Sequence, residues 1–234
     1  MQHVTVGSVS AVGAIQRVDL QDQVYETVKA RVLAGDLGPD ARLPLQGIAD
    51  ELSVSRTPVH HALTRLLTQR LVDLDSRGFR VRPVTAKHIE EAHGVRRALE
   101  LYAAEQTVGR VSAEQLRVLR YLLDDTVECV ENLELVDKHE YMLANKAFHE
   151  FLVDLAGNET LFYAYRSLSL HELMERVLFS GPTRAAGNST EEHGAIVAAY
   201  EAGDLDAARM AIIANIETGQ RIAVAMIEAS GGVL

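Results

Sequence analysis

The sequence predicts a mainly all-α protein of two domains, a winged helix-turn-helix followed by an antiparallel helical bundle. Three short helical patterns precede two alternating segments around Gly78, which is the element order of a winged helix-turn-helix. Every pattern after Pro83 has the period of a helix, and the loops between the helices are short. We therefore place the two domains at 20–84 and 85–234, behind a flexible N-terminal arm of residues 1–19.

The charge of the chain divides at the same place. The net charge of −10 by itself argues against a nucleic-acid partner. However, residues 53–84 hold six arginines against Asp73 and Asp75, a net charge of +4, whereas residues 85–234 carry a net charge of −11. A basic module is thus joined to an acidic one, and the basic module is the candidate for contact with DNA.

Length and composition narrow the class of protein. A chain of 234 residues with 47% hydrophobic residues can bury a substantial core. No run approaches the roughly 18 consecutive apolar residues of a membrane span, and the chain starts without a basic segment ahead of an apolar one. We expect a cytoplasmic protein without membrane contact. The single cysteine, Cys129, excludes an intramolecular disulfide.

The elements of the first domain follow from periodicity and from end signals. Apolar residues from Leu20 to Leu33 predict an amphipathic helix that ends at Gly35. A short helix is predicted over 45–52, and a third runs from its N-cap Ser55 to about Arg70. The buried stripe of this third helix is predicted to be Val59, Ala62, Leu63, Leu66 and Leu67. Its outward side is predicted to be Arg56, Thr57, His60, His61 and Thr64. A small β-hairpin around 76–78 completes the domain.

Six helices are predicted in the second domain. Thr85 is an N-cap residue, and Ser112 with Gln115 three residues later forms a capping box. Gly157 and Asn158 give a helix-ending signal. The predicted ranges are about 85–108, 112–132, 135–156, 159–179, 191–201 and 205–229.

The third helix and the hairpin carry the residue types that read DNA. A recognition helix needs short or bidentate donors in its first turns to reach base edges, and polar residues from Ser55 to His60 provide them. The hairpin supplies Arg77, Gly78 and Arg80, whose charge and close-approaching backbone suit phosphate or minor-groove contact. The candidate DNA-binding residues are Ser55, Arg56, Thr57, His60, Arg77, Gly78 and Arg42.

The same residues resemble a known family. The stretch AGDLGPDARL, then IADELSVSRTPVHHALTRLLTQRLV and the RGFRV hairpin, is similar over 20–83 to the DNA-binding domain of the GntR family of bacterial regulators. The resemblance implies that Arg56 and Thr57 touch the operator, helped by the wing. The chain departs from the family at Gln46 and Gly47, where members often carry Arg or Glu, and at His60, where Arg is frequent.

The acidic half resembles the FCD effector domain of the FadR subfamily over about 85–230. The resemblance rests on HGVRRALELYAAE, NKAFHEFLVDLAGN and EEHGAIVAAYEAGDLDAARMAIIANI. It implies a helical bundle that binds a small organic acid in a central cavity. Many such domains also hold a divalent metal such as zinc through one Asp and three His. Arg96 lies where the family places an inward arginine that pairs a ligand carboxylate, and a salt bridge to Glu100 is the alternative.

The four metal-ligand positions implied by the resemblance carry only two of the expected donors. An Asn amide oxygen is a weaker ligand than a carboxylate or an imidazole. Either an anionic effector supplies the missing charge, or the metal is absent and the same polar cluster grips the effector directly. The implied positions, which with Arg96 are also the candidate effector-binding residues, are Asn145, His149, His193 and Asn215. His171 and Arg166 lie on a helix that would also line the cavity.

These patterns predict a transcription regulator of the repressor type rather than an enzyme. It would bind a double-stranded DNA operator as a homodimer, and a small carboxylate would control its affinity. One alternative is a DNA-binding dimer whose helical half is purely structural. Another is a metal-dependent hydrolase built on Asn145, His149 and His193, although the chain has no HExxH motif and no phosphate-binding loop.

Overall fold

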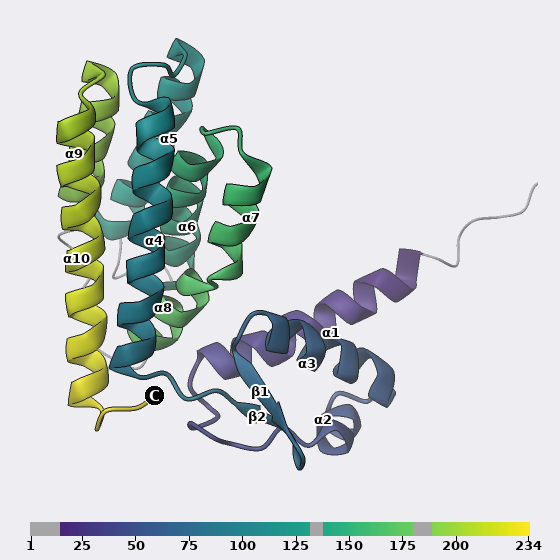
Figure 1. Ribbon diagram of the computed structural model, residues 1–234. Helices are drawn as coiled ribbons and strands as arrows, with labels where there is room; N and C mark the ends of the chain where they lie inside the picture. The colour runs from purple at the N-terminus through teal and green to yellow at the C-terminus, as the bar shows by residue number, and fades with distance from the viewer. Residues whose placement is uncertain (1–14, 132–137, 180–188) are drawn as a thin grey trace, which may run out of the picture.

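A computed structural model describes residues 15–131, 138–179 and 189–234 and shows two domains joined by a linker around Val84 (Figure 1). The described residues are mostly helical, and their one sheet has two strands, as predicted. The predicted arm up to residue 14 and the predicted helix start at 135–137 lie outside the described residues.

The N-terminal domain has the predicted order of three helices and a hairpin. Its elements are α1 (Ile15–Leu33), α2 (Leu45–Glu51), α3 (Arg56–Thr68), β1 (Val72–Asp75) and β2 (Gly78–Val81). The strands pair antiparallel with Val72 opposite Val81, and α1 packs against α3. The predicted stripe of α3 forms the core with α1, since Val59, Ala62, Leu63 and Leu66 are buried and Leu67 is partly buried.

Two details at helix starts differ from the prediction. Helix α1 begins at Ile15 rather than at Leu20. No helix-stopping residue stands between these positions, so the helix extends beyond its apolar stripe. Ser55 occupies the N-cap position of α3 with an extended backbone, but its side chain makes no capping hydrogen bond. Its hydroxyl is therefore not committed to the helix end.

The C-terminal domain is a bundle in which the long helix α10 packs against α4 and α9, while α5 packs against α6 and α9. Its core includes Leu119, Phe148 and Tyr200. The predicted caps are confirmed: Thr85 accepts from the backbone N–H of His88, and Ser112 and Gln115 bond reciprocally. The helices are α4 (Ala86–Thr107), α5 (Ala113–Glu131), α6 (Lys138–Asp154), α7 (Glu159–Ser167), α8 (Leu170–Phe179), α9 (Ser189–Ala202) and α10 (Leu205–Ala229).

The prediction of one helix over 159–179 was wrong, because the chain forms α7 and α8 with a break at Ser169. This residue has a φ of 48°, a left-handed conformation that a helix interior does not contain and that serine rarely adopts. Neither Gly nor Pro marks the break in the sequence. The described part of the bundle therefore has seven helices instead of six, and the break lets α8 begin with Leu170 and His171 buried.

Within the described residues, α10 alone is long and apolar enough to cross a membrane by length and composition. The same length and composition suit a core helix of a bundle. One face of α10 contributes Ala208, Ile212 and Ile216 to the core, and Arg209 pairs with Glu105 of α4. In this structure α10 packs one face against α4 and α9 of the bundle.

The two domains touch through α8 and through the linker. Helix α8 contacts α1, and the Arg176 guanidinium of α8 donates to the backbone carbonyl of Arg82. The backbones of Val84 and Leu234 pair through two hydrogen bonds of 2.8 and 3.0 Å. We call this pair the linker clasp. Figure 1 shows the C-terminus lying beside the linker at the base of the bundle.

Candidate DNA-binding surface and bundle cavity

The first turns of α3 present an exposed polar surface. All five residues predicted to face outward are exposed. With Leu45 of α2, four of them line a hollow at the surface: Arg56, Thr57, His60 and His61. The His60 ring also lies edge-on to Phe79 of β2, with the ring centroids 6.0 Å apart. Helix α3 and the wing therefore meet at His60.

The wing is held in shape from within. The Arg42 guanidinium donates two bonds of 2.8 Å to Asp75 and one of 3.3 Å to the Gly78 carbonyl. The backbone N–H of Arg77 also donates to Asp75, at 2.8 Å. These bonds, that of Arg42 first, hold the pKa of Asp75 well below its usual range. Gly78 has a φ of 106°, in the region that favours glycine.

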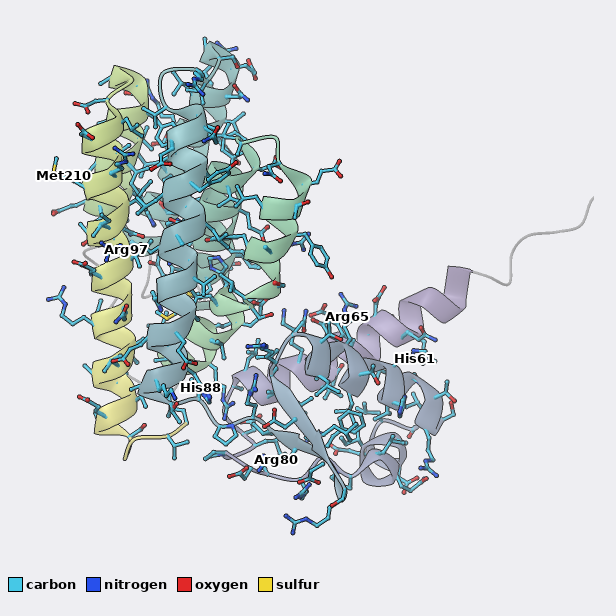
Figure 2. All side chains as sticks on the ribbon, viewed as in Figure 1. His61, Arg65, Arg80, His88, Arg97 and Met210 are labelled. Carbon is cyan, nitrogen blue, oxygen red and sulfur yellow. The ribbon has the colours of Figure 1, made fainter. Side chains whose placement is uncertain are left out.

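The arginines of this domain divide into two groups. Several are paired within the domain: Arg80 with Asp40 and Asp73, Arg82 with Asp73, and Arg65 with Asp22. In contrast, Arg56, Arg70 and Arg77 are exposed and form no salt bridge with any described residue. Figure 2 shows the labelled side chains of Arg65 and Arg80 on the domain, with His61 on the outer side of α3. Two of the predicted DNA contacts are thus unpaired, whereas Arg42 supports the wing.

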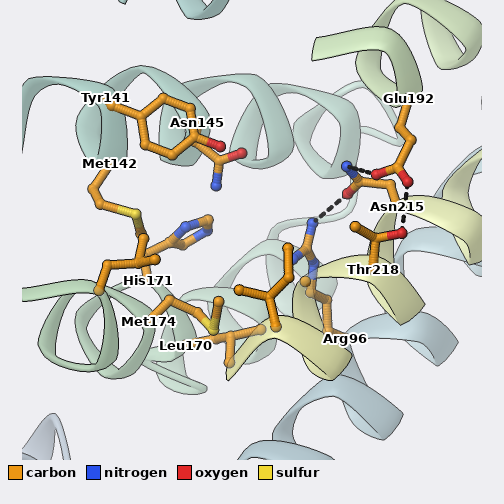
Figure 3. A pocket seen from close by; sticks show the side chains of 13 residues that line it. Arg96, Tyr141, Met142, Asn145, Leu170, His171, Met174, Glu192, Asn215 and Thr218 are labelled. Carbon is orange, nitrogen blue, oxygen red and sulfur yellow. Dashed lines mark hydrogen bonds between the residues drawn. The ribbon is translucent and has the colours of Figure 1, made fainter. Parts of the chain in front are cut away.

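The bundle contains a partly open cavity in which the centre of a water molecule can move through about 60 Å³. Helices α4, α6, α8, α9 and α10 all contribute to its wall (Figure 3). The polar part of the lining consists of Arg96, Asn145, His171, Glu192, Asn215 and Thr218. The apolar part includes Met142, Leu170, Met174, Leu178 and Ile222.

Arg96 anchors a buried chain of polar contacts along this wall. Its Nε donates to Glu100 at 2.7 Å, and its Nη2 donates to the Asn215 oxygen at 3.3 Å. The Asn215 amide then donates to Glu192 at 3.3 Å, and the Thr218 hydroxyl donates to Glu192 at 2.6 Å. Arg96 is therefore paired with Glu100 and lines the cavity at the same time.

The protonation states of this chain follow from burial and charge. Burial by itself would raise the pKa of Glu100, but the contacts of its carboxylate with Arg96 and His149 together outweigh burial and hold that pKa well below its usual range. Tyr165 donates its hydroxyl to Glu100 at 2.8 Å, and burial together with the Glu100 charge raises the pKa of this phenol. Glu100 is thus an anion that keeps the guanidinium in place.

Three buried imidazoles stand close to Arg96. His149 and His193 face each other with their Nε2 atoms 3.0 Å apart, and His171 lies beside His149. Burial lowers the pKa of all three, and the Arg96 charge lowers it further, so each ring is neutral at pH 7. His171 Nε2 is buried and has no hydrogen-bond partner among the described residues.

These residues do not fit the four-ligand metal site that the resemblance implies. His149 and His193 are placed like two ligands of one ion, but the Asn215 oxygen already accepts from Arg96. A guanidinium in contact with the fourth position repels a cation. Across the described ranges no three His, Cys, Asp or Glu side chains are arranged so that they could hold one metal ion. Metal binding stays a prediction that the geometry does not support.

The predicted effector residues occupy different parts of this region. Arg96, Asn145 and Asn215 line the cavity, whereas His149 and His193 are buried and are not part of its lining. His171 lines the cavity, but Arg166 pairs with Glu150 outside this lining. The sequence analysis missed Glu192 and Thr218. The position of Glu192 directly before His193 was the available signal.

A winged helix-turn-helix with unpaired outward arginines, joined to a helical domain with a polar cavity, defines a two-domain transcription regulator. The model described as "Bacterial regulatory proteins, gntR family" matches residues 20–81, and that of the FCD domain matches residues 91–218. The chain belongs to the GntR family of DNA-binding transcription regulators, among the members with an FCD domain. It is a regulator and not an enzyme.

Individual relatives agree with this assignment. The chain is 29% identical over 206 residues to a Paenarthrobacter nicotinovorans protein named "Probable D-xylose utilization operon transcriptional repressor", covering 86% of this chain and 88% of that protein. It is 31% identical over 140 residues to the regulator YdhC of Bacillus subtilis, covering 59% of this chain and only 62% of YdhC. The structure of Escherichia coli McbR/YncC has the same fold, with a TM-score of 0.69, 23% identity and coverage of 90% and 98%.

Proposed function

We propose that this protein is a homodimeric, operator-binding repressor whose DNA affinity is set by a small organic acid in the bundle cavity. One observation carries the proposal: α8 lines the cavity and also contacts the DNA-binding domain. Leu170, His171 and Met174 of α8 face the cavity, while the same helix packs against α1. A regulator of this type acts in the cytoplasm, and we expect no membrane contact.

The coupling between the sites follows from this position of α8. Arg176 is 3% exposed and holds the carbonyl of Arg82 at the start of the linker. Burial lowers the pKa of Arg176 to about 10, so it remains charged at neutral pH. A ligand that binds more tightly to one position of α8 shifts the population toward that position, and the DNA-binding domain moves with it.

The DNA-binding step uses the exposed surface of α3 and the wing. Arg56, Thr57 and His60 would reach base edges in the major groove, and the wing Arg77 would contact phosphates. In a dimer, two such helices enter successive grooves roughly 34–36 Å apart, which requires a pseudo-palindromic operator. The effector would favour a spacing that no longer fits and so release the DNA. The name of the Paenarthrobacter relative supports a repressor.

The test is a selection of genomic fragments by the purified protein at moderate salt. The variant Arg56→Ala serves as the test, and Arg117→Ala on the exposed side of α5 serves as the matched control. We expect the wild type and the control to enrich a short palindrome that Arg56→Ala does not retain. Enrichment without sequence preference would favour an architectural protein, and retention of no DNA would contradict the proposal.

A further inference from the structure

Opposite charges stand side by side on the cavity wall. The Asn215 amide separates them: its oxygen accepts from Arg96, and its nitrogen donates to Glu192 (Figure 3). Arg96 is fixed by Glu100, and Glu192 is fixed by Thr218. A ligand that touches this wall therefore meets a fixed cation and a fixed anion one amide apart.

This arrangement discriminates between classes of acid. A carboxylate gains from the Arg96 guanidinium, but a second carboxylate nearby would face Glu192 in a partly enclosed space where charges interact strongly. A plain monocarboxylate avoids that repulsion but gives Glu192 no new donor. An ammonium group next to the carboxylate supplies the donor and the complementary charge together.

The remainder of the lining suits an apolar body. Met142, Met174 and Leu178 line the cavity away from the charged wall. Thioether side chains adapt to ligands of varied shape.

An unpartnered group points independently to a ligand. His171 is 8% exposed, and its Nε2 has no hydrogen-bond partner in the described part of the chain. Figure 3 shows its ring pointing into the cavity. Leaving a buried polar atom unpaired is costly, and a neutral imidazole accepts a hydrogen bond from an ammonium or donates one to a carboxylate.

We propose that the cavity binds a small α-amino acid with an apolar side chain. Its carboxylate contacts Arg96, its ammonium contacts Glu192, and its side chain lies among the methionines. This inference rests on the proposed function, because it specifies the class of acid that the cavity senses. In this proposal Glu192 selects for ligands that carry an amino group.

The test compares each of two amino acids with the acid of the same carbon skeleton that lacks the amino group. Calorimetry on the full chain would use leucine and methionine, their desamino acids 4-methylpentanoate and 4-(methylthio)butanoate, the amine 3-methylbutylamine, and the dicarboxylate succinate. We expect one of the amino acids to bind at least tenfold more tightly than its desamino acid. The amine and succinate should bind at least a hundredfold more weakly than that amino acid.

The variant Glu192→Gln separates the role of Glu192 from that of the cavity as a whole. We expect this variant to bind the amino acid and its desamino acid within threefold of each other, whereas the exposed control Glu228→Gln keeps the wild-type preference. Tighter binding of a desamino acid or of succinate would overturn the zwitterionic ligand and leave acid sensing intact. Binding of none of these compounds would overturn the inference, while operator selection would still test the DNA-binding function separately.

Discussion

At the scale of single residues, the sequence leaves two alternatives open for Arg96. Its position predicted either a salt bridge to Glu100 or a contact with a ligand. The structure combines them, because Nε faces Glu100 while Nη2 faces Asn215 at the cavity wall. The i to i+4 spacing reveals the first partner, but the second comes from α10 and depends on how the helices pack. A buried ion pair adds little net stability. The main effect of the Arg96–Glu100 pair is therefore to hold the Arg96 guanidinium at the cavity wall.

Removing Glu100 should be strongly destabilising. The variant Glu100→Ala leaves the Arg96 charge buried without its partner and takes away the acceptor of Tyr165. We expect the free energy of unfolding in urea to fall by about 3–5 kcal/mol. The matched variant Glu114→Ala removes an exposed carboxylate that also pairs with an arginine and should change it little. Equal losses in the two variants would show that Glu100 does not balance a buried charge.

Stability should fall in mild acid because the bundle buries neutral imidazoles. Burial lowers the pKa of His93 to about 4, whereas an unfolded histidine has a pKa near 6.5. Between these values the unfolded chain binds the proton and the folded chain does not. The contribution of His93 is therefore complete above pH about 6.5 and is lost toward pH about 4, by roughly 1.4 kcal/mol per pH unit for one proton.

The variant His93→Gln isolates this contribution. We expect its free energy of unfolding to fall less between pH 7 and pH 5 than that of the wild type. His149, His171 and His193, whose pKa values shift in the same direction, keep part of the slope. An unchanged slope in urea titrations at the two pH values would mean that His93 takes up its proton in the folded protein.

At the scale of elements, local rules predicted most of the helices and the hairpin. The capping box at Ser112 and the buried stripe of α3 are visible in the sequence because they depend on residues a few positions apart. The break at Ser169 is not visible, because tertiary packing imposes a backbone conformation that serine does not signal. It matters for the site, since α8 starts there and brings His171 to the cavity.

Helix α8 should hold the linker through Arg176. In the variant Arg176→Met the hydrogen bond to the Arg82 carbonyl is lost without an unpaired charge being left behind. We expect the amide of Val84, which is bonded to Leu234, to exchange with deuterium at least tenfold faster by NMR. The amide of Val81, bonded to Ala41 inside the first domain, is the internal control. Equal rates for Val84 in both proteins would show that Arg176 does not restrain the linker.

At the scale of the whole molecule, the basic DNA-binding segment 53–84 is joined to the acidic domain 85–234. The net charge of −10 disfavours approach to DNA in most orientations, whereas the unpaired Arg56 and Arg77 favour approach through α3 and the wing. A dimer built this way presents two such surfaces to one face of the duplex. Specificity would then depend on the phase of the two half-sites as much as on their sequence.

This phase dependence gives a test of the assembly. Inserting half a helical turn, about 5 base pairs, between the half-sites places them on opposite faces of the DNA. We expect the affinity to fall at least a hundredfold in a gel-shift titration, toward that of a single half-site. The protein alone should sediment near twice 25.7 kDa. Undiminished binding to the altered operator would mean that each chain binds its half-site independently.

The linker clasp also has a practical consequence for handling the protein. The last helix returns the chain to the junction of the domains, where Leu234 is hydrogen-bonded to Val84. A purification tag or fluorescent protein fused directly after Leu234 would lie against that junction and disturb the relative position of the two domains. With a long flexible spacer, the same nearness becomes useful. A dye at the end of the chain and a second on the wing would report by energy transfer how far the domains swing apart in solution.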